Sequence, residues 1–468
     1  MTPAAAATKR IRRGLTAPSY EPRVRHPDSL WSDMASTAHR DDTHEATLAL
    51  IEESFDHVFI TGPAGTGKTT LLHEFVETTD KTVVVAAPTG VAALAVSGQT
   101  LHSLLRLPLG ILGSGDLGYC PREVLQLLRS IDALVIDEVS MVSADVMDGI
   151  DRRLRQAKGR KTIPFGGVQL VMFGDPYQLA PVVSGETERQ YFRDTYRSPW
   201  FFDARVWDET TLRTVVLDTV YRQADPAFQR ILHSLRDGTL DAETGRMLNE
   251  RGAEPALNPD IITLATTNNT VRAINESRLA ALEGEPRVAV AEIEGDFGQA
   301  KQFPADEELT LKPGAQVMFL RNDTGNQSGP RWVNGTLGIV HDITDTVLVD
   351  IDGELVEVEP VTWEKVRYEY DPGSKEVSSE VIAEFTQFPL RLAWAVTIHK
   401  AQGKTLDEAI IDLGPRAFAA GQTYVAFSRL TSLDGLHLAR PLRPSDIIVD
   451  PDVKRFFETA SSESASLW

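Results

Sequence analysis

The most informative stretch of the sequence reads Gly62-Pro63-Ala64-Gly65-Thr66-Gly67-Lys68-Thr69. It matches the pattern of a phosphate-binding loop throughout, and it lies between an apolar run (58–61) and a helical stretch (70–77). Glycines let backbone N–H groups face phosphate, and the helix that follows points its N-terminus at the same charge. The context therefore predicts a nucleotide site in which Lys68 reaches the β- and γ-phosphates and the Thr69 hydroxyl binds Mg²⁺. A chance match to the pattern is the alternative.

The predicted nucleotide-binding residues of this loop and of the helix after it are Gly62, Gly65, Thr66, Gly67, Lys68, Thr69 and Thr70.

From about residue 41, short apolar runs alternate with helical stretches, which is typical of a parallel α/β sheet. One series of expected strands comprises 58–61, 82–87, 133–137 and 169–173, and a second comprises 261–265, 391–397 and 408–412. The region 337–388 differs, because residues 346–358 alternate apolar and polar side chains around Asp352-Gly353, a hairpin signal. A second hairpin is expected from 366–370 and 381–385, around Asp371-Pro372-Gly373. The pattern predicts two α/β domains with a small β-barrel inserted into the second.

Two acids follow the apolar run Leu134-Val135-Ile136, namely Asp137 and Glu138. At the carboxyl end of a neighbouring strand, such acids lie where Mg²⁺ and the attacking water must be. We expect Asp137 to hold the metal and Glu138 to accept the proton from water. Taken alone, an Asp-Glu pair after a strand is usually a solvated strand end, and only its order after the phosphate loop makes it informative.

Three further side chains are candidates for the same chemistry. Gln178, in Gly174-Asp175-Pro176-Tyr177-Gln178, follows a third apolar strand, where an amide can sense the γ-phosphate. Arg222 and Arg429 follow apolar or aromatic residues, which suits guanidinium groups held at a partly buried interface against transition-state charge. The alternatives are an ordinary turn residue for Gln178 and surface salt bridges for the two arginines.

Composition sets limits on the class of protein. The 468 residues exceed what one hydrophobic core usually serves, so at least two domains are expected. With one cysteine, Cys120, no intrachain disulfide can form, and no apolar run approaches the roughly 18 residues of a spanning helix. We therefore expect no membrane partner and a reducing cytoplasm. The net charge of −20 lowers the expected non-specific affinity for nucleic acid without excluding a local cationic groove.

These sequence motifs, in this order, resemble those of superfamily-one helicases, and their residues are similar to those of the Pif/RecD-like branch. The matching segments run from Gly62 to about Gly435. They include Ala87-Pro88-Thr89-Gly90-Val91-Ala92-Ala93, Thr100-Leu101-His102-Ser103, Ile136-Asp137-Glu138-Val139-Ser140-Met141, Gly174-Asp175-Pro176-Tyr177-Gln178-Leu179, Val396-Thr397-Ile398-His399-Lys400-Ala401-Gln402-Gly403 and Tyr424-Val425-Ala426-Phe427-Ser428-Arg429. Pro164-Phe165-Gly166-Gly167-Val168-Gln169-Leu170 is similar to the stretch that separates Pif-like proteins from plain RecD.

The resemblance implies an α/β fold of two RecA-like parallel-sheet domains, with ATP between them and single-stranded DNA crossing their tops. It implies a wedge at about 104–130 and an SH3-like barrel at 337–388. The expected division is a flexible basic tail (1–40), domain 1A (41–198), domain 2A in two parts (199–336 and 389–455) around the barrel, and a C-terminal tail (456–468). The implied activity is an ATP-dependent 5′→3′ DNA helicase acting on single-stranded and forked or structured DNA, as a nucleoid-associated monomer when DNA is absent.

Site residues also follow from the resemblance. His44 stands where the family usually has the glutamine that reads adenine, so adenine selectivity is less secure than phosphate chemistry. Gln402 is expected to contact nucleotide. The residues expected at the DNA groove are Thr89, His102, Ser103, Thr397, His399 and Lys400. Hydroxyls, imidazoles and a lysine without a base-reading fork predict little sequence preference. A lone histidine is more often a packing residue. Asn334-Gly335 is expected to be a turn beside the barrel, with a DNA contact as the alternative.

Other departures from the family are Pro176 and Ala180 in the third motif, and the long extra domains of some members are absent, which indicates a minimal core. A P-loop GTPase or small-molecule kinase is disfavoured, because no Asn-Lys-x-Asp motif is present and the two arginines would have no role. Two further alternatives stay open. One is a translocase or clamp that remodels protein–DNA complexes without strand separation, and the other is a RecD-like subunit that works only within a nuclease complex.

Overall fold

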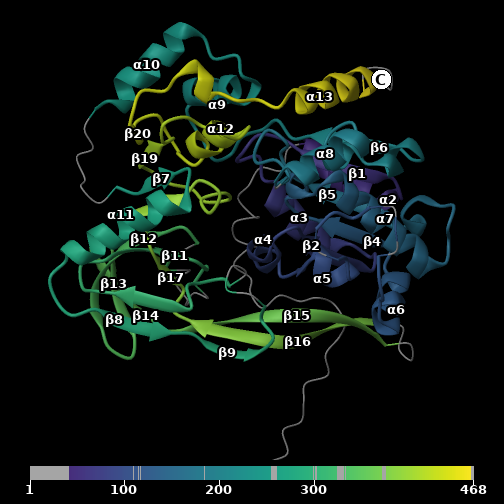
Figure 1. Ribbon diagram of the computed structural model, residues 1–468, viewed down its shortest axis with the longest axis horizontal. Coiled ribbons are helices and arrows are strands. Elements are labelled where there is room, and N and C mark those ends of the chain that lie inside the picture. The colour runs from purple at the N-terminus through teal and green to yellow at the C-terminus, as the bar shows by residue number, and fades with distance from the viewer. Residues whose placement is uncertain are drawn as a thin grey trace, which may run out of the picture.

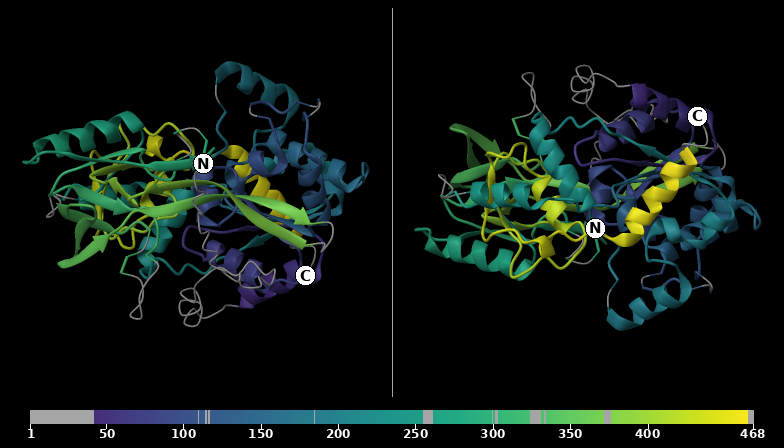
Figure 2. Two further views of the ribbon diagram at one scale, coloured as in Figure 1. Left: turned by 90° about the horizontal axis from the view of Figure 1, so that it is seen from below. Right: turned by 90° about the horizontal axis from the view of Figure 1, so that it is seen from above.

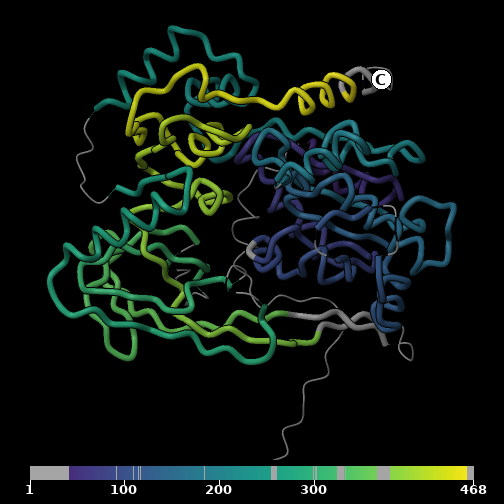
Figure 3. Tube along the Cα trace, in the orientation of Figure 1, coloured from purple at the N-terminus to yellow at the C-terminus, as the bar shows by residue number. Residues whose placement is uncertain are grey.

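The computed structural model describes residues 42–464 apart from 109, 114, 116, 184, 255–260, 299, 301–302, 324–330, 333 and 372–375. Two parallel sheets, each in its own domain, form the body of the molecule, and antiparallel sheets extend from the second domain (Figure 1). Figure 3 shows the course of the chain in the same orientation. The expected N-terminal tail and the tip of the second expected hairpin lie outside the described residues. No described helix is both long and apolar enough to cross a membrane.

Domain 1 is built on a six-stranded parallel sheet. Its strand order is β3 (Gln99–Thr100), β2 (Val83–Ala87), β4 (Ala133–Ile136), β5 (Gln169–Phe173), β1 (His57–Thr61) and β6 (Leu212–Val216). The four strands expected in this half are confirmed. The expected boundary at residue 198 is wrong for this sheet, because β6 pairs with β1 from His57↔Leu212 onward. The local sequence pattern could not show that β6 belongs to this sheet, because its membership follows from hydrogen bonding to β1.

The helices of domain 1 are α2 (Asp42–Glu53), α3 (Lys68–Thr78), α4 (Gly90–Ala95), α5 (Leu101–Leu105), α6 (Arg122–Ser130), α7 (Ala144–Lys158) and α8 (Gly185–Thr195). Short 3₁₀ turns supplement them: Val139–Met141, Pro164–Gly167, Phe201–Asp203 and Arg205–Asp208. The second of these holds the segment that resembles the Pif-like signature. There Phe165 is fully buried, and its ring meets His57 edge-on at 4.8 Å between centroids. This segment therefore packs beneath the sheet, at the start of β1.

Domain 2 is built on a four-stranded parallel sheet in the order β18 (Ala395–Thr397), β7 (Thr263–Ala265), β19 (Ala409–Asp412) and β20 (Leu436–Leu438). Its helices are α9 (Pro226–Asp237), α10 (Ala242–Gly252), α11 (Asn268–Ala281) and α12 (Gln422–Phe427), with a 3₁₀ turn at Pro444–Asp446. The single strand expected at 391–397 is two strands, because β17 (Leu390–Leu392) joins another sheet before β18 begins.

The barrel-like part is a five-stranded antiparallel sheet in the order β14 (Glu354–Val358), β13 (Val347–Ile351), β12 (Leu337–Ile343), β11 (Gln316–Phe319) and β17. The hairpin at Asp352-Gly353 is confirmed, with Ile351 opposite Glu354 and Asp352 at φ 53°. The expected bounds of 337–388 are too narrow at both ends, since β11 and β17 complete the sheet. A two-stranded sheet of β8 (Arg287–Val290) and β10 (Glu308–Leu311) lies beside it.

The second expected hairpin is a long arm formed by β15 (Val361–Asp371) and β16 (Glu376–Gln387), with β9 (Glu292–Gly295) as third strand. The arm leaves the barrel and crosses to domain 1, where it contacts α6 (Figures 1 and 2). At its root, Trp363 and Phe385 form a small core against which Leu94 of α4 packs. The arm therefore joins the two halves of the molecule on the side of α4 and α6.

Residues 456–464, expected as part of a C-terminal tail, are helical instead, because α13 runs over Pro451–Ser464; the last four residues of the expected tail lie outside the described residues. It follows domain 2 in sequence but lies on domain 1 (Figures 1 and 2). Phe456 stacks on Phe202 at 4.4 Å between centroids, and Val453 is fully buried in the domain 1 core. The segment is helical because the apolar face of α13 packs against the core of domain 1.

Candidate nucleotide site and its surroundings

The phosphate loop connects the buried strand β1 to the N-terminus of α3. Gly67 caps this helix in the left-handed region at φ 79°. A Cβ at Gly62 would lie 2.2 Å from the Leu217 carbonyl oxygen, and one at Gly65 would lie 2.6 Å from Cβ of Arg222. Only glycine therefore allows this close packing, which brings the segment that carries Arg222 directly against the loop.

Lys68 points back into the phosphate loop. Its Nζ donates to the carbonyl oxygens of Gly62 at 2.8 Å and Pro63 at 2.9 Å. Burial lowers the pKa of Lys68, and the carboxylates of Asp175 and Glu138 oppose that effect. Because burial disfavours this ammonium, an anionic group in the loop would stabilise it.

The two acids expected to be catalytic lie at the carboxyl end of β4. Glu138 has φ 50°, and its backbone N–H donates to Asp137 Oδ1 at 2.9 Å. Burial raises the pKa of Asp137 to about 6, and the Glu138 N–H and Lys68 pull it down. Burial, with Asp137 adding to it, raises the pKa of Glu138 to about 7, and Lys68 is the main opposing charge. Glu138 is therefore poised near neutrality, as a general base requires.

Two glutamines connect this acid to domain 2. Gln402 Nε2 donates to Glu138 Oε2 at 3.0 Å and to Gln178 Oε1 at 3.2 Å. Gln178 Nε2 in turn donates to Asp175 Oδ2 at 3.3 Å. Gln402 lies after β18 of domain 2, whereas the other three residues belong to domain 1. The amides therefore bridge the two domains at the acid itself.

Both candidate arginines lie at this interface. Arg429 is 1% exposed, and its guanidinium donates to carbonyl oxygens and to the Ser428 hydroxyl. Burial, with repulsion from Arg222, lowers the pKa of Arg429 to about 9. Burial also lowers the pKa of Arg222, whose Nη1 donates to the Ser428 carbonyl oxygen at 3.4 Å. Neither has a carboxylate ion pair within the described chain, so the surface salt-bridge interpretation is wrong for both.

These side chains fit a nucleotide triphosphate and Mg²⁺. The buried guanidinium group of Arg429 and the partly buried one of Arg222 repel each other beside the partly buried Lys68, so an anion would stabilise this site. The oxygen donors of Thr69, which is exposed, and Asp137 suit Mg²⁺, which proteins bind through one or two carboxylates together with substrate phosphates. Among the described residues no cluster of three metal-ligating side chains exists, so phosphate oxygens would have to complete the coordination.

Sequence reasoning missed a network around Asp175. This carboxylate is fully buried, and it accepts from Arg236 Nη2 at 3.3 Å and from the Tyr424 hydroxyl at 3.3 Å. The Tyr424 oxygen in turn accepts from the Ala64 N–H of the phosphate loop at 2.8 Å. Asp175 and Tyr424 stood within quoted motifs, but nothing in the sequence singled out Arg236. The network joins the loop to both domains.

His44, expected near the base, does lie beside the phosphate loop. Its side chain is 8% exposed, and its Nε2 would be 3.3 Å from a Cβ built at Gly67. The ring of Tyr221 meets it edge-on at 5.9 Å between centroids. Thr70 is exposed on α3, whereas Thr66, within the phosphate loop, is fully buried.

The six residues expected at the DNA groove lie on both domains. Thr89 caps α4, where its hydroxyl accepts from Ala92 N, and His102 and Ser103 lie half-buried on α5. His399 and Lys400 are exposed just after β18, whereas Thr397 is buried and its hydroxyl accepts from Lys400 N at 3.2 Å. Thr397 therefore orders this turn and presents little surface. Asn334-Gly335 forms a turn, as expected.

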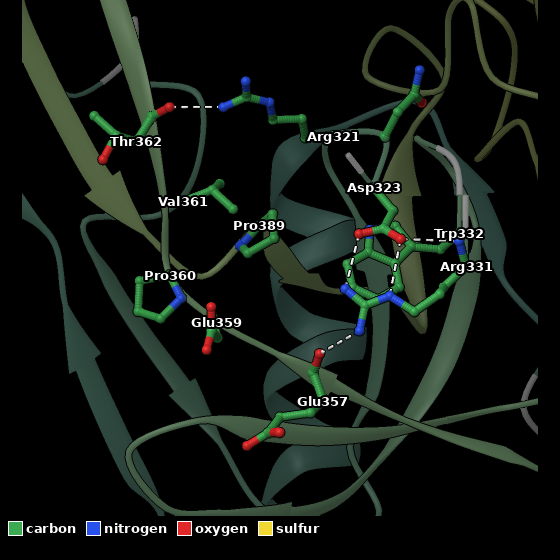
Figure 4. A pocket seen from close by; sticks show the side chains of 11 residues that line it. Arg321, Asp323, Arg331, Trp332, Glu357, Glu359, Pro360, Val361, Thr362 and Pro389 are labelled. Atoms are coloured by element: carbon green, nitrogen blue, oxygen red, sulfur yellow. Dashed lines mark hydrogen bonds and ion pairs between the residues drawn. The ribbon is translucent and has the colours of Figure 1, made fainter. Parts of the chain in front are cut away.

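A cavity of about 470 Å³ lies elsewhere, between the barrel and the root of the arm (Figure 4). Arg331 forms an ion pair with Asp323 at 2.9 Å and lies over the Trp332 ring, while Arg321 reaches across to the Thr362 carbonyl oxygen. None of the predicted site residues lines this cavity. It belongs to the junction of barrel and arm.

The fold and site define a class: a P-loop ATPase of two parallel-sheet domains, in which groups from both domains converge on the phosphate loop. The fold class predicted from the sequence is confirmed. Residues 39–246 match the family model described as PIF1-like helicase. The chain is 34% identical over 430 residues to the ATP-dependent DNA helicase Pif1 of Bdellovibrio bacteriovorus, covering 88% of this chain and 91% of that protein. It is also 34% identical to human ATP-dependent DNA helicase PIF1, of which it spans 61%.

The chain therefore belongs to the PIF1-like helicase family and is an ATP-dependent helicase. Solved structures of Bacteroides Pif1 agree. A complex with ADP-AlF4 matches at 36% identity and a TM-score of 0.82, covering 90% of this chain and 97% of that one. The structure of Bacteroides Pif1 bound to single-stranded DNA matches at a TM-score of 0.66, also at 36% identity and over 90% of this chain and 97% of that one. The arrangement described here is thus the more similar to the first of these.

Proposed function

We propose that this PIF1-like helicase moves 5′→3′ along single-stranded DNA and separates forked or structured duplexes, as a monomer in the absence of DNA. The general activity, that of an ATP-dependent DNA helicase, is the activity of the family. The observation that carries the proposal is the convergence of Glu138 from domain 1 with Gln402 and Arg429 from domain 2. A site divided in this way couples hydrolysis to relative motion of the domains. The direction of movement rests on the resemblance.

The roles of the side chains follow from their positions. Lys68 and the loop amides bind the phosphates, and Thr69 and Asp137 would hold a Mg²⁺ ion that neutralises charge on the phosphate oxygens. Glu138 accepts a proton from the attacking water, and Gln402 orients that acid. Gln178, which accepts from Gln402, senses the γ-phosphate. Arg222 and Arg429 stabilise the charge that develops on the phosphates, and their binding there draws the two domains together.

The DNA strand is expected to run over both domains. Thr89, His102 and Ser103 provide contacts on domain 1, and His399 and Lys400 provide them on domain 2, while Thr397 shapes the turn that presents the latter pair. Hydroxyls, imidazoles and an ammonium group favour contacts to phosphate and sugar. Binding should therefore depend strongly on salt and weakly on sequence.

The decisive measurement is ATP hydrolysis with and without single-stranded DNA, for the wild type and Lys68→Ala, followed by unwinding of duplexes with a 5′ or a 3′ tail. We expect DNA to stimulate hydrolysis, Lys68→Ala to reduce it at least a hundredfold, and only the 5′-tailed duplex to be unwound. Stimulated hydrolysis without unwinding of either duplex would favour the translocase alternative. No stimulation in folded protein would refute the assignment.

A further inference from the structure

The chain passes from domain 1 to domain 2 directly against the phosphate loop. Strand β6 of domain 1 ends at Val216 and helix α9 of domain 2 begins at Pro226, so residues 217–225 form the connection. All of these residues are described, and none of them lies in a helix or strand. The close approaches at the glycines of the phosphate loop are approaches to this connection. The connection is therefore placed to respond to whatever binds in the loop.

The first part of the connection is fastened to domain 1. The Leu217 N–H donates to the Thr61 carbonyl oxygen at 2.7 Å, and the Leu217 side chain is buried in the core beside β1. The Tyr221 N–H donates to the Gly65 carbonyl oxygen at 2.8 Å. As far as Tyr221, the backbone of the connection thus belongs to the phosphate loop and its domain.

From Gln223 onward the connection is fastened to domain 2. The side-chain Nε2 of Gln223 donates to the Leu430 carbonyl oxygen at 2.9 Å and to that of Ser428 at 3.3 Å. The main-chain oxygen of Gln223 accepts from Gln229 Nε2 of α9 at 2.6 Å. Only Arg222 lies between the last residue held by domain 1 and the first held by domain 2. The change from one domain to the other therefore takes place at this arginine.

The Gln223 amide holds the backbone on both sides of Arg429. Its two acceptors, Ser428 and Leu430, are the sequence neighbours of Arg429, and both are fully buried. Arg222 Nη1 donates to the same Ser428 carbonyl oxygen at 3.4 Å. The two guanidinium groups repel each other, which works against their approach to one another. One neutral amide thus keeps the backbone of the second arginine beside the first.

The other end of this amide lies against the phosphate loop. Gln223 is 1% exposed, and its Oε1 has no hydrogen-bond partner within the part of the chain that the structure describes. The same oxygen would be 3.2 Å from a Cβ built at Gly65. A buried polar atom without a partner is costly, and an apolar side chain would avoid that cost. Such a departure from favourable packing is typical of a residue that serves a functional geometry.

We infer that Gln223 is a positioning residue for Arg429, whose backbone it fixes on both sides so that the guanidinium reaches the phosphates when the two domains close on ATP. The inference rests on the proposed role of Arg429 in stabilising transition-state charge. A displacement of about 1 Å can cost a reaction about a hundredfold in rate. Because Gln223 acts through Arg429, its effect on the reaction should disappear once that guanidinium is removed.

The test uses two substitutions at Gln223. Gln223→Met removes the amide and keeps the length of the side chain. Gln223→Glu keeps the shape but places a carboxylate against two carbonyl oxygens, and only its protonated form donates a hydrogen bond. The matched controls are Gln190→Met and Gln190→Glu, because Gln190 is exposed on α8 and donates to Asp194 of the same helix. The measurements are kcat and KM for ATP with saturating single-stranded DNA, and equilibrium binding of ADP with and without fluoroaluminate.

Gln223→Met should lower kcat by about 10- to 100-fold. KM and the affinity for ADP should stay within about twofold, because the lost interaction acts in the transition state. Binding of ADP with fluoroaluminate should weaken by about tenfold, since this complex imitates the charge of the transition state. In an Arg429→Met background, Gln223→Met should lower kcat no further, which is the mark of two residues that act as a unit.

Gln223→Glu provides a rescue that a general loss of structure would not give. Its kcat, expressed as a ratio to the wild-type value at the same pH, should rise as the pH is lowered from about 8 to about 6, because burial raises the pKa of a carboxyl group and protonation restores one donor. Its affinity for ADP should stay constant over that range. The ratio for Gln190→Glu should not change with pH. This variant also tests the inference if Gln223→Met fails to fold.

The outcomes separate this inference from the proposed function. If the wild type shows no hydrolysis stimulated by DNA, the proposed function fails. If the wild type is stimulated and Gln223→Met keeps the wild-type kcat, the inference is overturned while the function stands. A full effect of Gln223→Met in the Arg429→Met background, or an equal loss of affinity for ADP and for ADP with fluoroaluminate, would also refute the positioning role. So would a pH-independent ratio for Gln223→Glu.

Discussion

At the scale of single residues, the acid Glu138 carries the chemistry because of where it is buried. Its backbone has φ 50°, its carboxylate accepts from Gln402, and burial with the neighbouring Asp137 raises its pKa to about 7. A group that must be ionised to accept a proton loses activity as the pH falls through its pKa. The same burial that removes this carboxylate from water thus places its titration close to neutral pH.

We therefore expect kcat/KM for ATP, measured with saturating single-stranded DNA, to fall as the pH is lowered through about 7. Because Asp137 and Glu138 interact, the apparent pKa of this fall in activity belongs to the pair of acids and not to one of them. Glu138→Gln should reduce kcat at least a hundredfold while nucleotide binding persists. The measurement is a pH–rate profile from about 5.5 to 9 together with equilibrium binding of a fluorescent nucleotide. A flat profile down to pH 5.5 would contradict the assignment of Glu138 as the base.

His44 leads to a prediction about nucleotide selectivity. An amide presents a donor and an acceptor side by side to adenine, whereas the two nitrogens of an imidazole point in different directions. We expect the wild type to discriminate weakly between ATP and GTP, and His44→Gln to raise the ratio of their kcat/KM values about tenfold. The exposed His233 on α9 supplies the control His233→Gln, for which the ratio should not change. Equal ratios in all three proteins would show that His44 does not face the base.

At the scale of elements, helix α13 illustrates how a terminal segment stabilises a distant domain. Trp200 Nε1 donates to Asp450 Oδ2 at 3.1 Å, and Arg455 pairs with Asp203 at 2.6 Å. The ring of Phe457 stacks on Tyr177 at 5.3 Å, next to the guanidinium of Arg236. The helix therefore covers apolar surface of domain 1 directly beside the segment 174–179, which carries Asp175 and Gln178.

Phe456→Ala should lower the free energy of unfolding of domain 1 by about 2 kcal/mol, which is less than the roughly 3–5 kcal/mol of a fully buried aromatic side chain, because Phe456 is only partly buried. Lys454→Ala on the exposed face of the same helix should stay within about 0.5 kcal/mol. Urea unfolding followed by tryptophan fluorescence measures both, because Trp200 and Trp207 of domain 1 are among the seven tryptophans that contribute to the signal. Equal midpoints for the two variants would show that α13 does not stabilise this domain.

At the scale of the whole molecule, the arm is one of several connections between the domains, beside the groups around the phosphate loop and helix α13. The arm touches domain 1 through α6, and through its root core against Leu94. The TM-score is 0.82 to Bacteroides Pif1 with ADP-AlF4 and 0.66 to the same protein bound to single-stranded DNA, at equal sequence identity. Because the sequences compared are equally similar, the difference lies in how the parts are arranged.

We expect single-stranded DNA to move the arm away from α6 in this protein. Dyes on Glu123→Cys in α6 and Val381→Cys in the arm, both at exposed positions, with Cys120→Ser, would report the distance. Energy transfer should fall on adding oligo(dT) and should hold its value with ADP and fluoroaluminate alone. A pair within domain 1, Glu77→Cys with Glu123→Cys, should not respond. Unchanged transfer in the first pair at saturating DNA would contradict the rearrangement.

The sequence by itself determined the nucleotide chemistry, because the residues that carry it are adjacent along the chain. Gly62 to Thr69 form one loop, and Asp137 with Glu138 end one strand, so local pattern and order were sufficient to identify them. Strands β1, β2, β4, β5, β7 and β19 of the two parallel sheets and the turn at Asp352-Gly353 were predictable for the same reason. Each depends on the apolar periodicity or the turn preference of a short segment.

Only the tertiary structure decided what depends on partners far apart in sequence. Tyr424 reaches the phosphate loop at Ala64 across 360 residues, and β6 completes the first sheet from beyond the expected boundary. Arg236 and Arg153 carried no signal, since an arginine on an amphipathic helix is usually solvated. What distinguishes them is burial against Asp175 and against the carbonyl oxygens of one loop, and burial is a property of the packed chain.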